Sequence, residues 1–319
     1  MPLGEFELIR RYFTRHAESA ILGVGDDAAL LPVTFGTELV VSTDMLVSGR
    51  HFFADADPYL LGRKSLAVNL SDMAAMGATP RWATLALALP AVNNNWLEAF
   101  ANGFFEIAAE FGVELVGGDT TRGALNICVQ ILGEIRPSLA LRRDGAKVGD
   151  VVWISGQLGG AALALADLQG KISLPTPIFE FCAKKLHDPS PRVALGLALQ
   201  GIAHSAIDIS DGLIGDLGHI LQRSNVAATI RIDKIPSSPQ IQSYLTQTWG
   251  KQALLAGGDD YELCFTAAPQ HTQAIQAISE RLQLPLTPIG AIIAGTGLVM
   301  LDEDDNPLDL SLKSFDHFS

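Results

Sequence analysis

The stretch Lys64-Ser-Leu-Ala-Val-Asn-Leu-Ser-Asp-Met-Ala-Ala-Met-Gly-Ala-Thr-Pro80 decides the fold of the chain around it. Asp57 is a good N-cap before it, and Pro58 suits the first turn of a helix. Gly77, followed by a proline three residues later, is a stop signal. The residues between these signals are mostly strong helix formers, so the sequence predicts one helix that ends near Met76.

Large apolar residues surround most of this predicted helix, which indicates a largely buried element. They are Leu66, Val68, Leu70 and Met73. Ser65, Asn69 and Asp72 recur at i, i+4 and i+7 and form one narrow polar stripe. The stripe either reaches solvent or lies inside the protein, where a carboxylate is costly unless a cation pairs with it. Further aspartates in similar apolar settings favour the second alternative.

The length of 319 residues is sufficient for two domains, each with its own core. Residues 141–147 are basic and rich in turn formers, and we expect the boundary near them, with domains over 1–138 and 139–319. The start of the chain shows no signal-peptide pattern, and no apolar run is long enough to span a bilayer. Cys128, Cys182 and Cys264 are far apart, as expected for core thiols in a reducing compartment, so we expect a cytoplasmic protein.

The formal net charge of −13 disfavours binding to nucleic acid, because the phosphate backbone attracts basic surfaces. An acidic protein can still bind a polyanion such as ATP when divalent metal ions lie between the two sets of negative charge.

Helical and strand patterns mix throughout both halves, which predicts an α/β (α+β) protein with helices packed on mixed sheets. Besides the central helix and one following Gly212, the expected helices cover 5–16, 95–111, 159–169, 177–186, 192–199, 240–248 and 270–282. The expected strands cover 38–44, 81–89, 113–116, 125–135, 150–155, 206–211, 228–232, a strand after the turn at 257–260, 286–293 and 298–301.

Seven aspartates share one setting, beside Gly, Ser or Thr and near the end of an apolar element: Asp26, Asp27, Asp44, Asp72, Asp119, Asp208 and Asp211. Clusters of carboxylate oxygens suit Mg²⁺, and the scarcity of nearby His and Cys argues against zinc. Any one of these aspartates could be a cap or a turn residue, but capping explains all seven poorly. The chain contains neither a P-loop nor a protein-kinase catalytic loop. Ser210 has no partnered histidine in the sequence and is read as an N-cap or a phosphate contact.

Six motifs, in order along essentially the whole chain, together resemble the thiamine-monophosphate kinase family. They are Gly23-Val-Gly-Asp-Asp-Ala28, Ser42-Thr-Asp44, Ala67-Val-Asn-Leu-Ser-Asp-Met-Ala-Ala-Met-Gly77, Gly117-Gly-Asp-Thr-Thr-Arg-Gly123, Ala206-Ile-Asp-Ile-Ser-Asp-Gly-Leu213 and Gly257-Gly-Asp-Asp-Tyr-Glu-Leu263. The resemblance implies a two-domain aminoimidazole-ribonucleotide-synthetase-like fold and a homodimer built through the N-terminal domain. It also implies an enzyme that phosphorylates thiamine monophosphate with ATP and Mg²⁺.

The resemblance also implies roles for individual residues. The implied metal ligands are Asp27, Ser42, Thr43, Asp44, Asp72, Asp119, Asp208 and Asp211, and the implied nucleotide contacts are Gly118, Asp119, Arg143 and Ser210. The implied contacts to thiamine phosphate are His51, Asp259 and Phe315, and the implied catalytic set is Asp44, Asp72, Asp119, Arg143 and Asp211. Family members often have Glu at the position of Asp259 and Tyr or Trp at that of Phe315.

Two alternatives remain open from the sequence. The first is another enzyme of the same superfamily, which would activate a different substrate with ATP. A selenophosphate synthetase would need a reactive cysteine or selenocysteine early in the chain, but the first cysteine here is Cys128. A purine-pathway synthetase would show different motifs around the central helix. A non-catalytic, metal-binding structural dimer is the alternative from another class of protein.

Overall fold

A computed structural model describes residues 4–245 and 247–308 of the chain. The chain forms two compact units. Unit 1 comprises Met1–Met73 and Ala78–Ser138, and unit 2 comprises Ala74–Gly77 and Leu139–Ser319.

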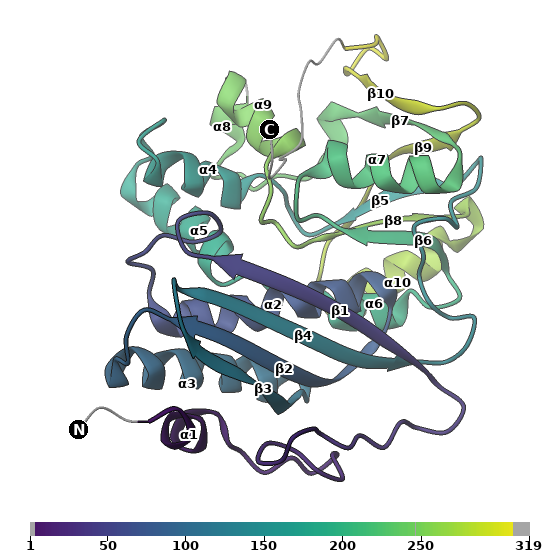
Figure 1. Ribbon diagram of the computed structural model, residues 1–319. Coiled ribbons are helices and arrows are strands. Elements are labelled where there is room, and N and C mark those ends of the chain that lie inside the picture. Colours follow the sequence, from purple (N-terminus) through teal and green to yellow (C-terminus); the bar gives the residue numbers. More distant parts are fainter. Residues whose placement is uncertain (1–3, 246, 309–319) are drawn as a thin grey trace. The chain divides into compact units, whose positions relative to one another are not determined.

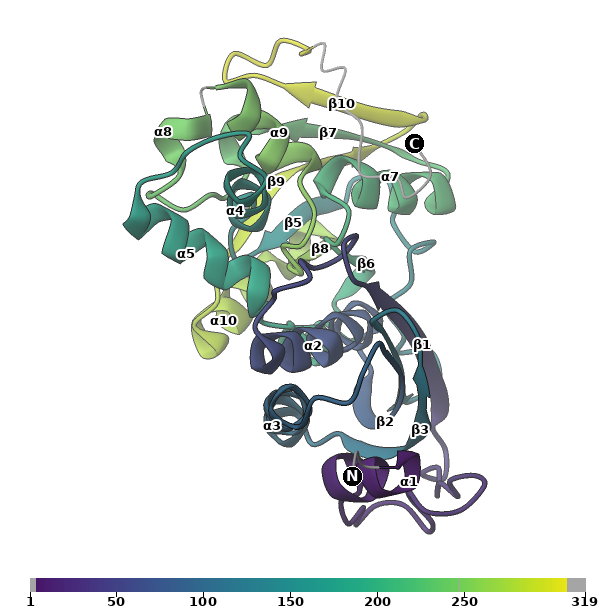
Figure 2. The ribbon, with the colours of Figure 1, turned by 60° about the vertical axis from the view of Figure 1, so that its left-hand side comes forward.

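Unit 1 is built on a four-stranded mixed sheet with the order β1-β4-β2-β3. Its strands are β1 (Glu38–Val47), β2 (Thr79–Leu89), β3 (Glu114–Arg122) and β4 (Asn126–Ile135). β4 pairs antiparallel with β1 and β2, whereas β2 and β3 are parallel. Two long helices, α2 (Pro58–Met76) and α3 (Asn94–Phe111), cover one face of this sheet (Figures 1 and 2).

The predicted central helix is confirmed as α2. The Asp57 carboxylate accepts the backbone N–H groups of Tyr59 and Leu60 at 2.8 and 3.1 Å, which caps the first turn as its sequence position predicts. The helix is buried as expected, since Leu66, Leu70 and Met73 have no exposed surface (0% each).

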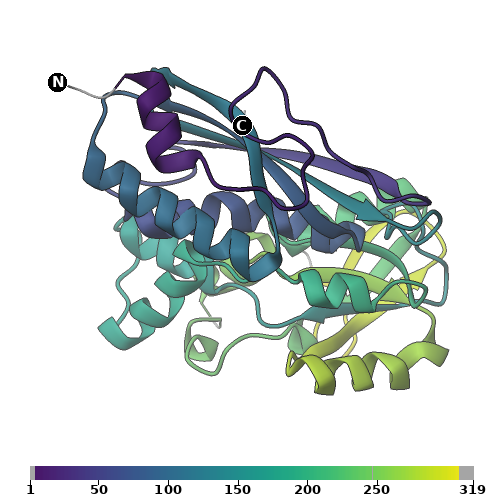
Figure 3. The ribbon, with the colours of Figure 1, turned by 90° about the horizontal axis from the view of Figure 1, so that it is seen from below.

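The N-terminal helix is shorter than the range 5–16 predicted for it. α1 (Glu5–Leu8) continues into a π-helical segment, Ile9–Phe13, and Thr14 is extended, with its hydroxyl donating to the Ile9 carbonyl at 3.2 Å. This side-chain bond satisfies a carbonyl at the helix end and closes the helix early. Figure 3 shows the N-terminal helical segment, in purple, beside α3. The rings of Phe13 and Phe100 meet edge to face between them, with centroids 6.4 Å apart.

Strands β1 and β3 of unit 1 continue well beyond their predicted ends, and β2 begins two residues before its predicted start. β1 continues to Val47 because its pairing with β4 continues to Asn126, so Ser42, Thr43 and Asp44 lie within the strand and not at its end. The strand expected over 113–116 is β3, which runs on through the Gly-Gly-Asp motif because β2 offers a parallel partner as far as Leu89. Hydrogen bonding to a neighbouring strand thus overrides the turn-forming tendency of both motifs.

Unit 2 contains a six-stranded mixed sheet with the order β10-β7-β9-β5-β8-β6. Its strands are β5 (Val151–Ser155), β6 (Ala203–Asp208), β7 (Ala227–Arg231), β8 (Leu263–Ala267), β9 (Leu286–Ile293) and β10 (Gly297–Leu301). Helix α7 (Leu213–Ser224) buries its apolar side, including Leu217, Ile220 and Leu221, in the main core of this unit. Helix α10 (Thr272–Leu282) lies on the other face of the sheet (Figure 1).

The remaining helices of unit 2 include α4 (Gly160–Leu168), α5 (Thr176–His187) and α6 (Val193–Ala198). The helix predicted over 240–248 is wrong in its extent: α8 (Gln242–Leu245) is one short turn, and α9 (Thr248–Ala256) is a separate helix that the sequence analysis missed. Gln247 is extended between them, and it starts the second helix as its N-cap.

The predicted fold class, mixed sheets flanked by helices, is confirmed in both units. None of the helices within residues 4–245 and 247–308 combines the length and the apolar character needed to cross a bilayer.

Candidate active site

The polar stripe of α2 faces strand β1 inside unit 1. The Ser42 hydroxyl donates a hydrogen bond to Asp72, and the backbone N–H of Asp44 donates to the Asn69 side-chain oxygen at 3.2 Å. Ser65 and Asn69 are buried, at 1% and 0% exposure, so the stripe does not simply reach solvent. The Ser42 hydroxyl is thus one partner of the Asp72 carboxylate inside unit 1.

Thr43 and His51 are oriented by other contacts. Side chains alternate along a strand, so Thr43 points to the face opposite Ser42 and accepts a hydrogen bond from Gln130 at 3.4 Å. The Nδ1 atom of His51 accepts the Val47 backbone N–H at 3.0 Å, which puts the proton of the neutral ring on Nε2. His51 can therefore present a donor to an anionic ligand.

The Gly-Gly-Asp motif of unit 1 lies on the edge strand β3. Gly118 has φ +149°, and a Cβ there would lie 1.9 Å from the Leu85 carbonyl oxygen, so only glycine fits. Asp119 pairs in register with Ala86 of β2 and is exposed. Asp26 and Asp27 are also exposed, and the Asp26 carboxylate accepts the Asp27 backbone N–H at 2.9 Å.

In unit 2 the turn between β6 and α7 carries Asp208, Ser210 and Asp211. Asp208, the last residue of β6, is 5% exposed. Asp216 on α7 accepts the backbone N–H groups of Asp211 and Gly212, both at 3.1 Å. The turn thus brings several carboxylates together, and its backbone is hydrogen-bonded to Asp216 in the first turn of α7.

The electrostatics of this turn are shown by Asp216, which is 3% exposed. Burial, followed by repulsion from Asp208, raises the pKa of Asp216 to about 7, although the N–H groups of Asp211 and Gly212 favour its ionised form. Carboxylates that repel one another in this way form a region of negative potential that favours a bound cation.

The segment Gly257–Leu263 joins this turn to a second glycine-rich loop in unit 2. Asp259, at φ +68°, donates its backbone N–H to the Ser210 carbonyl at 2.9 Å. Asp260 accepts the Gly159 backbone N–H at 2.8 Å, and burial raises the pKa of Asp260 well above its usual value.

Glu262, in the same segment, is held by a buried ion pair. Glu262 is 1% exposed, and both of its carboxylate oxygens accept from the Arg192 guanidinium, one of them at 2.6 Å. The Ser155 hydroxyl donates to the same carboxylate at 2.6 Å. This network fixes the Gly-Gly-Asp-Asp-Tyr-Glu motif against the end of β5.

Two predicted contacts remain without supporting geometry. The side chain of Arg143 is exposed, and its backbone carbonyl accepts the Ser224 hydroxyl at 2.8 Å. Phe315 lies outside the described residues.

Within residues 4–245 and 247–308, no group of three or more His, Cys, Asp or Glu side chains stands close enough to hold a metal ion. The donors that are brought together, Ser42 with Asp72 and both Asp208 and Asp211 with Asp216, are oxygens of the kind that Mg²⁺ prefers. In donor chemistry the predicted residues therefore fit Mg²⁺.

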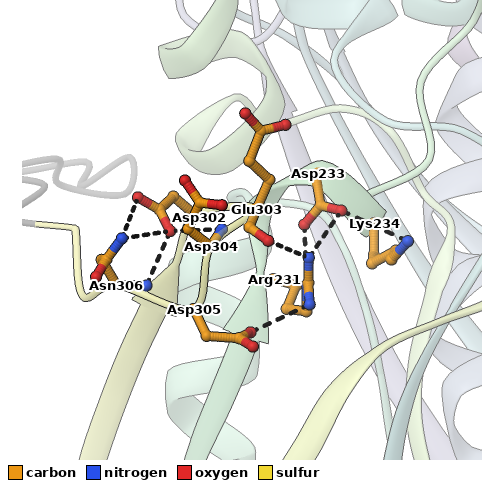
Figure 4. A network of polar contacts seen from close by, with 8 residues as sticks. All are labelled: Arg231, Asp233, Lys234, Asp302, Glu303, Asp304, Asp305 and Asn306. Atoms are coloured by element: carbon orange, nitrogen blue, oxygen red, sulfur yellow. Dashed lines mark hydrogen bonds and ion pairs between the residues drawn. The ribbon is translucent and has the colours of Figure 1, made fainter.

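A further acid-rich segment, residues 302–306, forms a surface turn that is held by contacts within the chain. Asp302 accepts the backbone N–H groups of Asp304 and Asn306 at 2.9 and 2.8 Å, and Arg231 forms ion pairs at 3.1 Å with Asp233 and Asp305 (Figure 4). Each of these contacts is made by the chain itself, so they account for the segment as a turn on the surface.

Sequence reasoning missed four residues that organise the candidate site: Arg192, Asp216, Asp260 and Glu262. Asp216 carried a signal, because an acid in the first helical turn after Ser-Asp-Gly can reach the N–H groups of that turn. Arg192 carried none, since it lies 70 residues from the glutamate with which it pairs.

Comparison with known proteins agrees with this architecture. Residues 25–135 match the family model of the AIR synthase related protein, N-terminal domain, and residues 147–303 match that of the C-terminal domain. Two such domains in this order, each with a mixed sheet, define an AIR synthase related protein.

Individual relatives show to which family within this class the chain belongs. The chain is 42% identical over 323 residues to thiamine-monophosphate kinase of Escherichia coli strain K12, covering 100% of this chain and 99% of the relative. The crystal structure of thiamine-monophosphate kinase from Stenotrophomonas maltophilia K279a matches with a TM-score of 0.87 and 46% identity, covering 94% of this chain and 97% of that one. AaThiL complexed with AMPPCP and TMP matches with a TM-score of 0.77 and 31% identity, covering 90% of each chain. The chain belongs to the thiamine-monophosphate kinase family.

Proposed function

We propose that this protein transfers the γ-phosphate of ATP to thiamine monophosphate and forms thiamine diphosphate. The observation that carries the proposal is the 42% identity to a thiamine-monophosphate kinase over the full length of both chains. The complex of the related AaThiL with AMPPCP and TMP supports it, because AMPPCP is an analogue of ATP.

The residues divide into three roles in this proposal. The ATP phosphates contact Gly118, Asp119, Arg143 and Ser210, and thiamine phosphate contacts His51, Asp259 and Phe315. Mg²⁺ would be held by Asp27, Ser42, Asp44, Asp72, Asp119, Asp208 and Asp211. Thr43 would contribute through its backbone, because its side chain lies on the opposite face of β1. When bound, the metal neutralises the charge of the phosphates and so permits two polyanions to approach.

The chain itself supplies positioning. The nucleophile is a phosphate oxygen that is already ionised near neutral pH, so the reaction needs little help from a general base. Gly118 lets β3 lie against the backbone of Leu85 on β2, where any side chain would clash, and so places the Gly-Gly-Asp motif; Arg143 adds a fixed positive charge. The Nε2–H of His51 donates to the acceptor phosphate, which orients the attacking oxygen.

We expect direct in-line transfer within a ternary complex, without a phosphoenzyme. Ser210 is the obvious alternative nucleophile, but its described hydrogen bond is the one that its carbonyl accepts from the Asp259 N–H, and the neighbouring carboxylates of Asp208 and Asp211 are assigned to Mg²⁺. Aspartates that bind Mg²⁺ are poor nucleophiles. Inversion at the transferred phosphorus follows from a single displacement.

The test couples ADP release to a labelling experiment. ADP release should depend on thiamine monophosphate, and γ-labelled ATP with Mg²⁺ but without acceptor should leave no label on the protein. ADP release that is indifferent to thiamine monophosphate would exclude the proposed substrate. A labelled protein that passes its phosphate to the acceptor would exclude direct transfer.

The division of labour between domains is also part of the proposal. Residues 1–138 provide metal binding, ATP binding and dimerisation, and residues 139–319 complete the active site. We place the protein in the cytoplasm, and the three cysteines, which form no disulfide, support that location.

We propose that the protein is a homodimer built through unit 1. One face of the unit 1 sheet carries α2 and α3, whereas Leu39, Val41 and Met45 of β1 are 44%, 51% and 53% exposed on the other face. A row of exposed apolar side chains on one sheet face is typical of a surface that a second protein covers. A second copy of this chain is the proposed partner.

Val41→Asp should convert the dimer to monomers, because a carboxylate in an apolar interface would lose its hydration without a partner. Light scattering of the purified protein measures the change. Val299→Asp is the matched control, since Val299 is 39% exposed on a strand of unit 2. A wild-type protein that is monomeric at micromolar concentration would contradict the proposal.

A further inference from the structure

The turn that carries Ser210 and Asp211 connects β6 to α7 in unit 2 (Figure 1), and the 257–261 segment holds one side of it. The Asp259 N–H donates to the Ser210 carbonyl at 2.9 Å, and the Tyr261 N–H donates to the Ile209 carbonyl at 2.8 Å. A Cβ on Gly258 would lie 2.4 Å from the Ser210 carbonyl oxygen, so the two segments are in close backbone contact. The carbonyl side of the turn is therefore fixed.

The other side of the turn presents backbone N–H groups, and Asp216 holds them. A single carboxylate oxygen, Oδ2, accepts both the Asp211 and the Gly212 N–H at 3.1 Å. Gly212, the N-cap of α7, has φ +109° and no side chain with which to cap the helix. Asp216 thus reaches back from the first turn of α7 to the two N–H groups that precede the helix.

A carboxylate is a costly means of capping a helix at this position. Asp216 is 3% exposed, and burial of a carboxylate costs free energy that its hydrogen bonds must offset. A hydroxyl or an amide at the N-cap would satisfy a helix start at lower cost. The arrangement is better explained by the geometry that it imposes on Ser210 and Asp211.

We propose that Asp216 is a positioning residue for the proposed reaction: by accepting the Asp211 and Gly212 N–H groups it fixes the direction in which Ser210 and Asp211 present their side chains to magnesium-bound ATP. Asp216 itself does not touch the nucleotide. The inference rests on the function proposed above. It means that the turn is held on one side by the 257–261 segment and on the other by Asp216.

The test compares Asp216→Ala with Asp216→Asn. Alanine removes the acceptor, whereas the amide oxygen of asparagine keeps an acceptor for both N–H groups and removes only the charge. Asp167→Ala is the matched control, because Asp167 accepts one backbone N–H, that of Leu174 at 2.6 Å, elsewhere in unit 2. Each variant is measured for its thermal midpoint without ligands, for binding of AMPPCP with Mg²⁺ by calorimetry, and for phosphate transfer.

We expect Asp216→Ala to weaken binding of AMPPCP with Mg²⁺ about tenfold and to lower kcat/KM by roughly 10- to 100-fold, the range found when the support of a metal site is removed. Asp216→Asn should restore both values to within about threefold of the wild type, since one oxygen can accept both N–H groups. Asp167→Ala should lower the midpoint without changing the affinity or its dependence on Mg²⁺.

Three results would overturn the proposal. Asp216→Ala could bind and react like the wild type, Asp216→Asn could be as impaired as Asp216→Ala, or Asp167→Ala could lower affinity equally. If Asp216→Ala does not fold, Asp216→Ser replaces it, because its shorter side chain withdraws the acceptor and remains polar. A wild-type protein that binds AMPPCP with Mg²⁺ but transfers no phosphate to thiamine monophosphate would refute the proposed function, while the binding comparison would still decide the role of Asp216.

Discussion

Asp72→Asn is expected to lower phosphate transfer by at least about 100-fold while the protein stays folded, because the metal's charge stabilisation contributes several kcal/mol and each 1.4 kcal/mol is tenfold in rate. The amide oxygen can still accept the hydrogen bond that Ser42 now donates to the carboxylate, so the contact between α2 and β1 survives. What the substitution removes is the negative charge that the proposed Mg²⁺ needs.

Two measurements check this result. Turnover is recorded at limiting and at saturating Mg²⁺, and the thermal midpoint is recorded with AMPPCP, with and without a chelator. A ligand that binds only the folded protein stabilises it by about 2.7 kcal/mol at 100 times its Kd, so the wild type should show a clear rise only when Mg²⁺ is present. Asp72→Asn should show little rise in either condition.

Asp57→Asn is the matched control for Asp72→Asn. It makes the same change of charge on the same helix, at the exposed N-cap of α2, where the amide oxygen still accepts the Tyr59 N–H. Turnover should remain that of the wild type. Wild-type turnover of Asp72→Asn at limiting Mg²⁺ would mean that the metal role assigned to Asp72 is wrong.

Arg192→Ala is expected to have the largest effect on stability, a loss of about 3–5 kcal/mol, because it leaves a buried carboxylate without its cation. Glu262 is 1% exposed and accepts from Arg192 through both oxygens, so water cannot readily replace the guanidinium. Denaturant unfolding of the purified protein measures the loss.

Replacing both residues of the ion pair tests whether the loss of stability comes from the unpaired charge. Arg192→Leu combined with Glu262→Met should recover part of the loss, since apolar side chains carry no unpaired charge. Arg231→Ala, which breaks ion pairs on the surface of the same unit (Figure 4), should destabilise far less because solvent replaces its partners. A change of less than about 1 kcal/mol for Arg192→Ala would show that the buried pair is not stabilising.

Local chemistry explains why several features could be predicted from the sequence. The start of α2 depends on a carboxylate two residues before Tyr59 and on a proline in the first turn, both of which are adjacent in the chain. Its burial follows from apolar residues on most sides, and the comparisons confirm the family that the motifs indicated. These features depend on neighbours within a few residues or on motif identity, so no tertiary information is needed.

Strand ends could not be predicted in the same way. Ser42-Thr-Asp44 and Gly117-Gly-Asp119 look like turns, yet both lie within strands because β4 and β2 continue to offer backbone partners beside them. A strand extends for as long as its neighbour accepts its hydrogen bonds, and that neighbour is distant in the sequence.

The sequence by itself determined the fold class, the buried central helix and the family, because spacing, capping and ordered motifs are written in consecutive residues. Only the tertiary structure decided what each polar group contacts. Asp72 meets a hydroxyl from β1, Asp216 holds the turn of Ser210 and Asp211, and Glu262 pairs with an arginine 70 residues away. The reason is physical: a buried polar group takes whichever partner the packing of distant segments brings within hydrogen-bonding distance.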